Sequence, residues 1–295
     1  MTNRWLNKNR VKEIGSTLIS LLTVFWLAVE VLSYFSNAYS DQFLKNAGVY
    51  ITALSVILLV SIYINRPLNS KKEKIKDRDN FVEIKVGDAF NNKGALVVPF
   101  NNYLDVSLNG NVAKADSIQN RLIIDYYDNK AEHLDLDINK SYKTKIEHEI
   151  GTVVEIEKNS KLFYLLVNTH KQENNRVKSE DGDLQTALVS LWDYIANNSR
   201  RNDSLTIPII SAGHGRTPEQ KKDILKKIIY SFVKVSQTLN VCNNLVVSIP
   251  EKYVNNGIIK LDDVFDYLSY VCNHFIVDEF ELNKPNKDST SKPLT

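Results

Sequence analysis

The chain begins with two long apolar runs. Residues 16–35 form the first run, which carries one ionisable side chain, and residues 47–64 form the second, which carries none. A helix needs about 20 predominantly apolar residues to cross the hydrocarbon core of a bilayer. The pattern therefore predicts two transmembrane helices. A cleaved signal peptide is a poorer interpretation. The apolar region of a signal peptide is shorter than residues 16–35, and in this chain a second apolar run follows at once.

Basic residues flank the outer ends of this pair. Residues 1–15 carry Arg4, Lys8, Arg10 and Lys12, whereas the connecting residues 36–46 carry a single lysine. Because lysine and arginine collect on the cytosolic side, we expect both termini in the cytosol and a multi-pass protein of the inner membrane. Residues 65–80 are rich in lysine and arginine, and we expect a basic linker that either faces anionic lipid or is simply solvated.

Each predicted span has one polar face. Helical spacing groups small and hydroxyl residues along these faces, which consist of Ser16, Ser20, Thr23, Leu27 and Glu30 in the first span and of Gly48, Thr52, Ser55 and Leu59 in the second. Small residues allow close packing of helices, and an ionisable group inside a span usually faces a bundle interior or water. Either these faces line an oligomeric pore with Glu30 as a pore residue, or they pack the two helices together with Glu30 near the outer interface.

After the linker, short apolar runs alternate with helical patterns. The runs predict strands, and residues with a 3.6 period predict helices. The strands are expected at 81–86, 95–100, 151–156, 161–168, 205–210, 245–249 and 275–280, and the helices at 116–127, 182–199, 218–239 and within 258–274. Thr217 is the expected N-cap of the third helix, with Pro218 in its first turn. A polar loop is expected at 171–181 and a disordered tail at 283–295. The alternation predicts one α/β domain over residues 81–282, with a largely parallel sheet covered on both faces.

Charge and composition narrow the function. The chain has 37 basic and 35 acidic residues, a balance that argues against a nucleic-acid surface. Its two cysteines, Cys242 and Cys272, are too few for a disulfide scaffold, and we expect both to behave as buried hydrophobic residues. The five histidines are scattered along the sequence, and Ile146–Ile150 lacks the second histidine of a zinc-protease helix. We therefore expect no metal site.

Three segments follow predicted strands, where open α/β sheets bind ligands. They are Gly87–Ala89, Pro99–Tyr103 and Ser211–Thr217. The third reads Ser211, Ala212, Gly213, His214, Gly215, Arg216 and Thr217, and a glycine-containing turn before a helix presents backbone N–H groups to a diphosphate. An ordinary tight turn has the same pattern, and the lysine of a P-loop is missing. Phe100 and Tyr103 either stack on a base or ribose or pack in the core.

These three segments, in this order, resemble a macro domain. The family's Gly-Asp-Ile turn is matched by Gly87, Asp88 and Ala89, its Asn-bearing loop by residues 97–102, and its Ile-Pro pair and glycine-rich loop by residues 207–215. The resemblance covers about residues 81–280. It implies a three-layer α/β/α fold with a mixed, mostly parallel sheet, and it implies binding of ADP-ribose or a related nucleotide. By this resemblance Asp88 contacts the adenine amine, Asn101 and Asn102 lie near the distal ribose, and residues 211–217 wrap the diphosphate.

One departure concerns catalysis. Hydrolytic macro domains carry a glycine run after the Asn loop, and residues 103–110 lack it. The resemblance therefore implies a binding protein without catalytic residues or cofactors.

Two spans before such a domain resemble the membrane effectors of type II Thoeris anti-phage defence. That family implies a TIR-domain enzyme as the NAD-consuming partner, an ADP-ribose-derived signal such as a histidine conjugate, a homo-oligomer and disruption of the lipid bilayer. Two alternatives stay open. A membrane-tethered ADP-ribosyl hydrolase would place water or a base near Asn101, Asn102 or Asp105, and a passive scaffold would only bind modified proteins.

Overall fold

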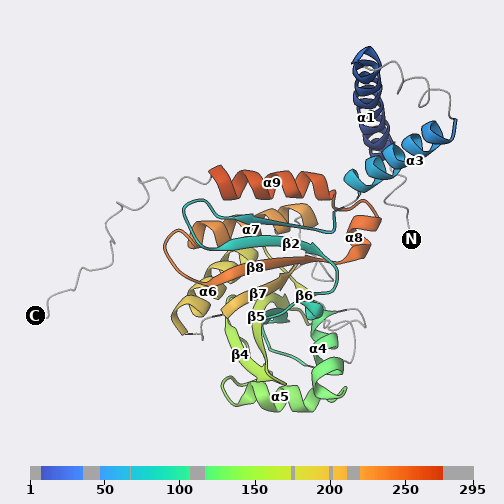
Figure 1. Cartoon of the computed structure of the whole chain (residues 1–295). Helices are drawn as coiled ribbons and strands as arrows, with labels where there is room; N and C mark the ends of the chain where they lie inside the picture. Colours follow the sequence, from blue (N-terminus) through green and yellow to red (C-terminus); the bar gives the residue numbers. More distant parts are fainter. Residues whose placement is uncertain are drawn as a thin grey trace, which may run out of the picture. The chain divides into compact units, whose positions relative to one another are not determined.

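The computed structural model describes residues 8–35, 47–66, 68–106, 117–173, 177–198, 202–210 and 220–274. The chain divides into two units, Met1–Asn69 and Ser70–Thr295. The first contains helices α1 (Lys8–Phe35) and α3 (Ala47–Ile64) (Figure 1). The bounds of α3 are those that the sequence predicts, whereas α1 begins eight residues before the predicted span. Hydropathy marks only the apolar part of a helix, and the good helix formers before residue 16 extend it.

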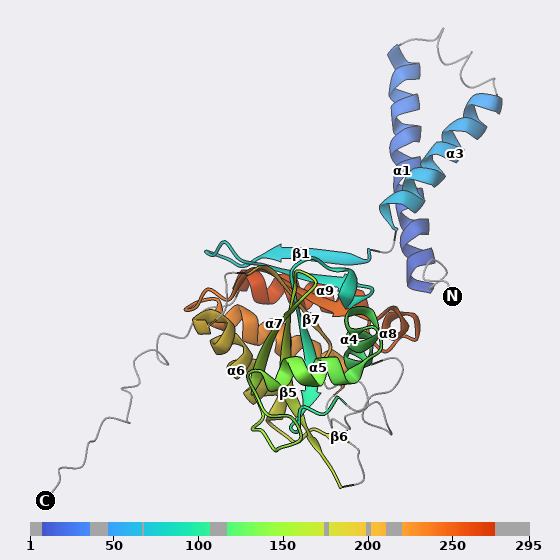
Figure 2. The same cartoon turned by 90° about the horizontal axis from the view of Figure 1, so that it is seen from below.

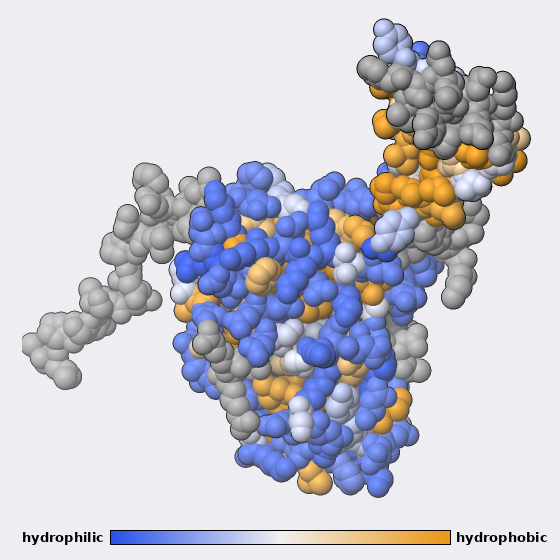
Figure 3. All heavy atoms as spheres, viewed as in Figure 1, coloured by the Kyte–Doolittle hydropathy of each residue, from blue (hydrophilic) through white to orange (hydrophobic). Residues whose placement is uncertain are grey.

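Both helices are long and apolar enough to cross a membrane. The spanning windows are Val11–Val31 and Ala47–Ile64. Their large side chains are exposed, as Val24 and Leu59 illustrate with 68% and 65% of their surface accessible. In Figure 3 the surface of these helices is mainly orange, whereas that of the α/β unit is mainly blue. The first unit thus has the surface of a bilayer-spanning segment.

The two helices meet through residues other than their polar faces. Ser61 Oγ donates to the carbonyl oxygen of Ile14 at 2.8 Å, and Asn65 Nδ2 donates to Thr17 Oγ1 at 3.0 Å. By contrast, every residue assigned to the two polar faces is exposed in this unit, and hydroxyls such as Thr52 Oγ1 donate to a carbonyl one turn earlier in their own helix. Thr23, Leu27 and Glu30 nevertheless line one hollow with Tyr50 and Leu54 of α3, so both interpretations of the polar faces stay predictions.

The second unit is built on a mixed sheet. Its strands are β1 (Ser70–Lys74), β2 (Phe81–Val86), β3 (Ala95–Asn101), β4 (Val153–Lys158), β5 (Lys161–Lys171), β6 (Val177–Lys178), β7 (Asn202–Pro208) and β8 (Cys242–Ile249). The order is β1-β2-β8-β7-β3-β5-β4, and β6 pairs with β5. Neighbours from β2 to β5 are parallel, whereas β1, β4 and β6 are antiparallel to their partners. The predicted mixed, mostly parallel sheet is confirmed.

Strand β1 corrects the prediction of a linker at residues 65–80. Residues 70–74 all pair with β2, from Ser70 opposite Lys85 to Lys74 opposite Phe81, and Figure 2 shows β1 as a separate strand. Lysines are common on sheet edges because they discourage pairing with other chains. An edge strand of this kind has no apolar alternation for a sequence pattern to detect.

Helices cover both faces of the sheet. They are α4 (Ile118–Tyr127), α5 (Ala131–Asn139), α6 (Asp183–Asn198), α7 (Lys221–Val235), α8 (Glu251–Asn255) and α9 (Leu261–His274). Helices α6, α7 and α9 build one hydrophobic cluster with the sheet, and α4, α5 and residues 89–90 build the other. In β3, Ala95 and Val97 face the first cluster and Leu96, Val98 and Phe100 the second. Burial on both faces explains the continuous apolar runs of the parallel strands.

Other boundaries differ from the prediction. Helix α7 begins at Lys221 with Gln220 at its N-cap, so Thr217 is not the cap of this helix. Its apolar period is carried by residues from Ile224 onward, and the helix starts one turn before them. The predicted loop at 171–181 contains β6, whose pairing with β5 lengthens that strand. The expected strand at 275–280 and the tail at 283–295 lie outside the described residues.

The core contains a buried indole and the two cysteine thiols that the sequence predicts to be buried. Trp192 is 1% exposed, and its indole N–H donates to Ser231 Oγ at 3.0 Å. Cys242 and Cys272 are both buried and free. Helix α6 is thus joined to α7 by one polar contact inside an otherwise apolar layer.

Replacing Ser231 with alanine should lower the free energy of unfolding by about 1–3 kcal/mol, because the indole N–H of Trp192 is then buried without an acceptor. Chemical denaturation of the full chain in detergent, followed by near-UV circular dichroism, measures the change. Thr238→Ala, which removes an exposed hydroxyl, is the control and should change stability by less than about 0.5 kcal/mol. Equal stability of the two variants would contradict the prediction.

Candidate ligand-binding site

The parallel strands bring two of the three predicted segments to one edge of the sheet. Strand β2 ends before Gly87, and β3 ends at Asn101. Both strands run parallel to β8 and β7, which lie between them. Their carboxyl ends therefore share an edge, where ligands bind in folds of this class.

The third segment, Ser211–Thr217, lies outside the described residues. It comprises Ser211, Ala212, Gly213, His214, Gly215, Arg216 and Thr217. The described backbone before it ends at Ile210, just past the carboxyl end of β7. The chain therefore enters this segment from a strand located between the ends of β2 and β3 in the sheet.

The turn after β2 depends on a glycine. Gly87 has a φ of 142°, in a region that favours residues without a Cβ atom. Its N–H donates to the carbonyl of Ile249 at 2.9 Å, and its own carbonyl accepts from Ser248 Oγ at 3.0 Å. These two hydrogen bonds hold the turn against β8 and fix the position of the backbone of Asp88.

Asp88 is held by two donors. One carboxylate oxygen accepts the backbone N–H of Phe90 at 3.1 Å, which caps a short 3-10 helix over Ala89–Asn91. The other oxygen accepts from Arg121 Nη1 of α4 at 2.5 Å. The hydrogen bond that Arg121 donates to Asp88 raises the pKa of Arg121, even though burial opposes the shift. Asp88 keeps 27% of its side-chain surface exposed, so the carboxylate remains accessible to a further donor.

Arg121 has two further contacts. Its Nη2 donates to Asp125 Oδ2 at 3.0 Å, one helical turn later. Its Cζ lies 4.9 Å from the centroid of the Phe90 ring, within range of a cation–π interaction. The guanidinium therefore joins α4 to the segment that follows β2.

The turn after β3 is organised by Asn101. Its Oδ1 accepts the backbone N–H groups of Tyr103 at 2.9 Å and Asp105 at 3.3 Å. Leu104, inside this turn, has a φ of 47° and is fully buried. A left-handed backbone at a bulky residue is strained and persists only when its surroundings enforce it. Asn101 is 3% exposed, and its Nδ2 has no hydrogen-bond partner among the described residues.

Asn102 connects neighbouring segments. Its Oδ1 accepts the backbone N–H of Lys171 at 2.8 Å, and its Nδ2 donates to Glu147 Oε1 at 3.0 Å. The residue is 2% exposed. Both ends of the amide are thus used within the protein, and this side chain supports the edge of the sheet.

An ion pair between Lys171 and Asp105 stabilises the end of the turn that follows β3. Lys171 Nζ lies 2.6 Å from Asp105 Oδ2, and Gln119 Nε2 donates to the Asp105 carbonyl at 2.6 Å. The ammonium is 5.8 Å from the centroid of the Tyr103 ring. Tyr103 is half-buried at this edge.

Two other predicted site residues lie in the core. Phe100 and Ala89 are 2% and 4% exposed and belong to the hydrophobic cluster under α4. Core packing, one of the two interpretations open for Phe100, is therefore what the structure shows.

Replacing Lys171 with methionine should cost about 2 kcal/mol of unfolding free energy, because the carboxylate of Asp105, with 8% of its side chain exposed, loses the ammonium 2.6 Å away. The double variant D105N/K171M should recover part of this loss, as a double-mutant cycle by chemical denaturation would show. The control is Lys140→Met, which breaks a pair whose lysine is 74% exposed and should cost less than about 1 kcal/mol. Equal effects of the two single variants would contradict a buried role for the Asp105 pair.

Sequence reasoning missed three residues that organise this edge. Arg121 stands in a helix, Lys171 in a segment predicted to be a loop, and Glu147 in a stretch without a pattern. Each reaches the site only through the fold, at sequence separations of 33, 66 and 45 residues from its partner. No local pattern marks such pairs.

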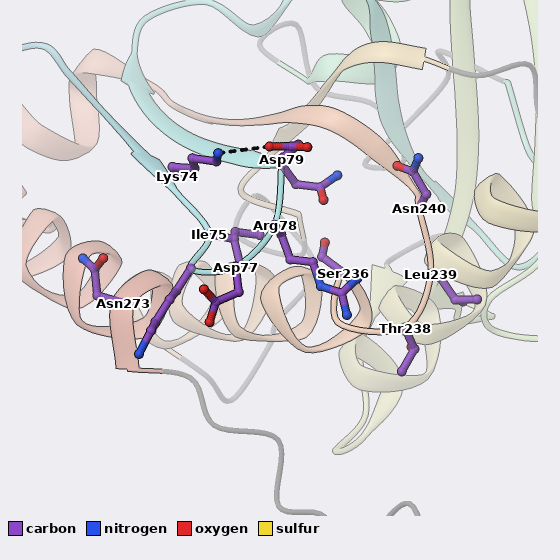
Figure 4. Close-up of a pocket in the computed structure, with 12 residues that line it drawn as sticks. Lys74, Ile75, Asp77, Arg78, Asp79, Ser236, Thr238, Leu239, Asn240 and Asn273 are labelled. Atoms are coloured by element: carbon purple, nitrogen blue, oxygen red, sulfur yellow. Dashed lines mark hydrogen bonds and ion pairs between the residues drawn. The ribbon is translucent and has the colours of Figure 1, made fainter.

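A cavity of about 670 Å³ lies at the opposite edge of the sheet. It is formed by the turn between β1 and β2 and by residues that follow α7 and end α9 (Figure 4). The turn is tied down there, because the backbone N–H of Lys76 donates to Cys272 O at 2.9 Å and the Arg78 guanidinium donates to the Gln237 carbonyl. Since this is the amino end of β2, the cavity is separate from the candidate site. Within the described ranges, no three histidine, cysteine or acidic residues gather to hold a metal ion.

Comparison with known proteins gives one family. The model of the macro domain of the Thoeris protein ThsA matches residues 82–250, more than half of the chain. No curated protein sequence shows a significant match.

Several solved macrodomains of Oceanobacillus iheyensis are similar in structure. A single-residue variant is 17% identical with a TM-score of 0.48 and covers 68% of this chain and 93% of its own. A second variant, solved with ADPR, is 18% identical with a TM-score of 0.46, covering 67% and 99%. The macrodomain solved with ADP is 16% identical with a TM-score of 0.43, covering 67% and 97%.

Proposed function

This chain belongs to the Thoeris ThsA macro-domain family, and from that premise we propose that it is a membrane-anchored receptor for an ADP-ribose-type nucleotide. The observation that carries the proposal is the shared edge of the sheet. Asp88 and the turn held by Asn101 lie at the carboxyl ends of β2 and β3, and the chain enters Ser211–Thr217 from β7 between them.

Each part of such a nucleotide has a candidate partner. The exposed part of the Asp88 carboxylate would accept the amine of adenine, and residues 211–217 would bind the diphosphate through backbone N–H groups. Asn101 Nδ2 is a buried donor without a partner in the described part of the chain. Since unpaired buried donors are costly, a ribose hydroxyl is a suitable acceptor for it.

We propose binding without hydrolysis. Asp105 is paired with Lys171, and the amide of Asn102 is bonded at both ends. A hydrolase needs a base that can take a proton from water, whereas an amide is not such a base and the Asp105 carboxylate is held by the Lys171 ammonium. The missing glycine run after residue 102 supports the same conclusion.

The topology suits a signal that passes to the helical unit. The chain enters the α/β unit at Ser70, which pairs with Lys85 three residues before Asp88. Strand β1 is antiparallel to β2, so this entry point lies at the same edge of the sheet as the candidate site. A change in the turn after β2 would therefore act close to the residue where the two units join.

We propose that α1 and α3 span the inner membrane with both termini in the cytosol, and that ligand binding drives copies of the chain to assemble. The exposed polar faces of the two helices, with Glu30, would then meet between copies and permeabilise the bilayer. The signal would be an ADP-ribose derivative such as a histidine conjugate, made by a TIR-domain enzyme that consumes NAD.

Dye-loaded vesicles of phosphatidylethanolamine and phosphatidylglycerol that contain the full chain provide the test. ADP-ribose and its histidine conjugate are added separately, and binding, nucleotide turnover and dye release are measured. The receptor predicts saturable binding, no product, and release only with ligand. Product formation would favour the hydrolase, and binding without release would favour a passive scaffold.

A further inference from the structure

We propose that Arg121 is a positioning residue that makes the site selective for a base carrying an exocyclic amine. The inference rests on the proposed function and adds to it the residue that orients Asp88. Arg121 lies in the second turn of α4, outside the segments that the sequence points to.

The contacts of Asp88 leave two acceptor positions of its carboxylate open. Phe90 N–H takes one carboxylate oxygen and Arg121 Nη1 takes the other. Each oxygen of a carboxylate has two lone pairs, so each retains one acceptor position. Two fixed donors hold the plane of the carboxylate, and the remaining positions therefore face defined directions.

The guanidinium of Arg121 is held by contacts of its own, so it can fix the orientation of the Asp88 carboxylate. Asp125 holds its second nitrogen, and the guanidinium lies over the Phe90 ring. The backbone beneath that ring is fixed by Lys161, whose Nζ donates to the carbonyls of Phe90 at 2.8 Å and of Asn92 at 3.1 Å. Helix α4 and strand β5 therefore clamp the segment that carries Asp88 from two sides.

Charge gives the selectivity. The Asp88 carboxylate accepts from Phe90 N–H and from Arg121 Nη1, and an ionised carboxylate is an acceptor only. Adenine presents an amine at the position where hypoxanthine presents a carbonyl. The amine donates to Asp88, whereas the carbonyl oxygen meets a carboxylate and is repelled. Without Arg121 the carboxylate would be free to rotate or to be solvated, and this distinction would weaken.

The experiment compares two nucleotides that differ in this one group. The full chain in detergent is titrated with ADP-ribose and with inosine diphosphate ribose, and the ratio of the two Kd values is measured. We expect the unmodified chain to prefer ADP-ribose at least about tenfold, the range that one charge-assisted hydrogen bond supplies.

Arg121→Gln should weaken ADP-ribose binding about tenfold, leave the inosine compound within about twofold, and bring the ratio close to one. Arg121→Lys keeps the charge and one donor and should restore part of the preference. Glu132→Gln removes an exposed charge in the first turn of α5 and touches neither Arg121 nor Asp88, so this control should bind as the unmodified chain does. The affinity for the inosine compound reports folding, because a misfolded variant loses both ligands.

The outcomes separate this inference from the function beneath it. If the unmodified chain binds neither nucleotide, the proposed function fails and the role of Arg121 fails with it. If it binds ADP-ribose and Arg121→Gln keeps the same ratio, only the role of Arg121 is overturned. Tighter ADP-ribose binding by Arg121→Gln would also overturn it, since the arginine would then compete with the ligand for Asp88.

If Arg121→Gln loses both ligands, the Arg121→Lys variant decides. A Kd ratio that stays clearly above one supports the inference, and a ratio near one overturns it.

Discussion

Replacing Asp88 with alanine is expected to weaken ADP-ribose binding by roughly 10- to 100-fold. The change removes the carboxylate of the segment that joins β2 and β3, and it leaves Arg121 without the partner that lies 2.5 Å from its Nη1. A hydrogen bond to a charged group contributes about 1.5–3 kcal/mol, which corresponds to this range. Calorimetric titration of the full chain in detergent measures the effect, and dye release from vesicles should fall in parallel.

Asp88→Asn separates binding from folding. Asparagine is as good an N-cap as aspartate, so the bond from Phe90 N–H and the short 3-10 helix should remain. The amide cannot accept from both Arg121 and an adenine amine as the carboxylate does, so affinity should still fall. If both variants bind ADP-ribose like the unmodified chain, Asp88 does not contact the base and the base is recognised by other residues.

Inserting six glycine and serine residues after Asn69 should strongly lower ligand-triggered dye release while leaving nucleotide affinity unchanged. Ser70 is fixed opposite Lys85 by the ladder between β1 and β2, and a flexible insertion would separate this anchored residue from α3. Coupling between two sites typically changes an equilibrium by about 5- to 150-fold, so release at a given ligand concentration should drop by a factor in that range.

The matched control places the same insertion between Leu239 and Asn240, in the turn that joins α7 and β8. Asn240 is exposed, and the turn lies at the amino end of β8, at the edge of the sheet opposite the candidate site. This insertion should leave binding and release unchanged. Undiminished release with the insertion after Asn69 would show that the signal does not depend on a short connection through β1.

The buried parallel strands were the most predictable part of the fold. The bounds of β2 match the prediction because apolar and polar residues alternate along it. Those of β3 differ by one residue, because a strand covered on both faces is a continuous apolar run. Strand β1 and helix α5 were missed for the opposite reason. The first is a charged edge strand, and the second buries only Leu134 and Ile138, too few positions for a periodic signal.

The candidate site divides in the same way. The shared edge followed from the order of strands and turns, which the sequence shows. The partners of Asp88 and Asp105 did not, because Arg121 and Lys171 come from a helix and a strand end that meet these residues only in the folded chain. Asn102 looks from the sequence like a second ligand contact, yet both ends of its amide are bonded within the protein.

The two cysteines have a practical consequence. Burial raises the pKa of both Cys242 and Cys272 to about 12, so almost none of either thiol is a thiolate at neutral pH, and only the thiolate reacts with alkylating reagents. Maleimide reagents should therefore label the native chain very slowly. A single cysteine introduced at Ser20 or Ser55, both exposed in the helical unit, would be the one reactive sulfur. Its labelling rate before and after nucleotide addition would report directly on which surface the helices hide when they assemble.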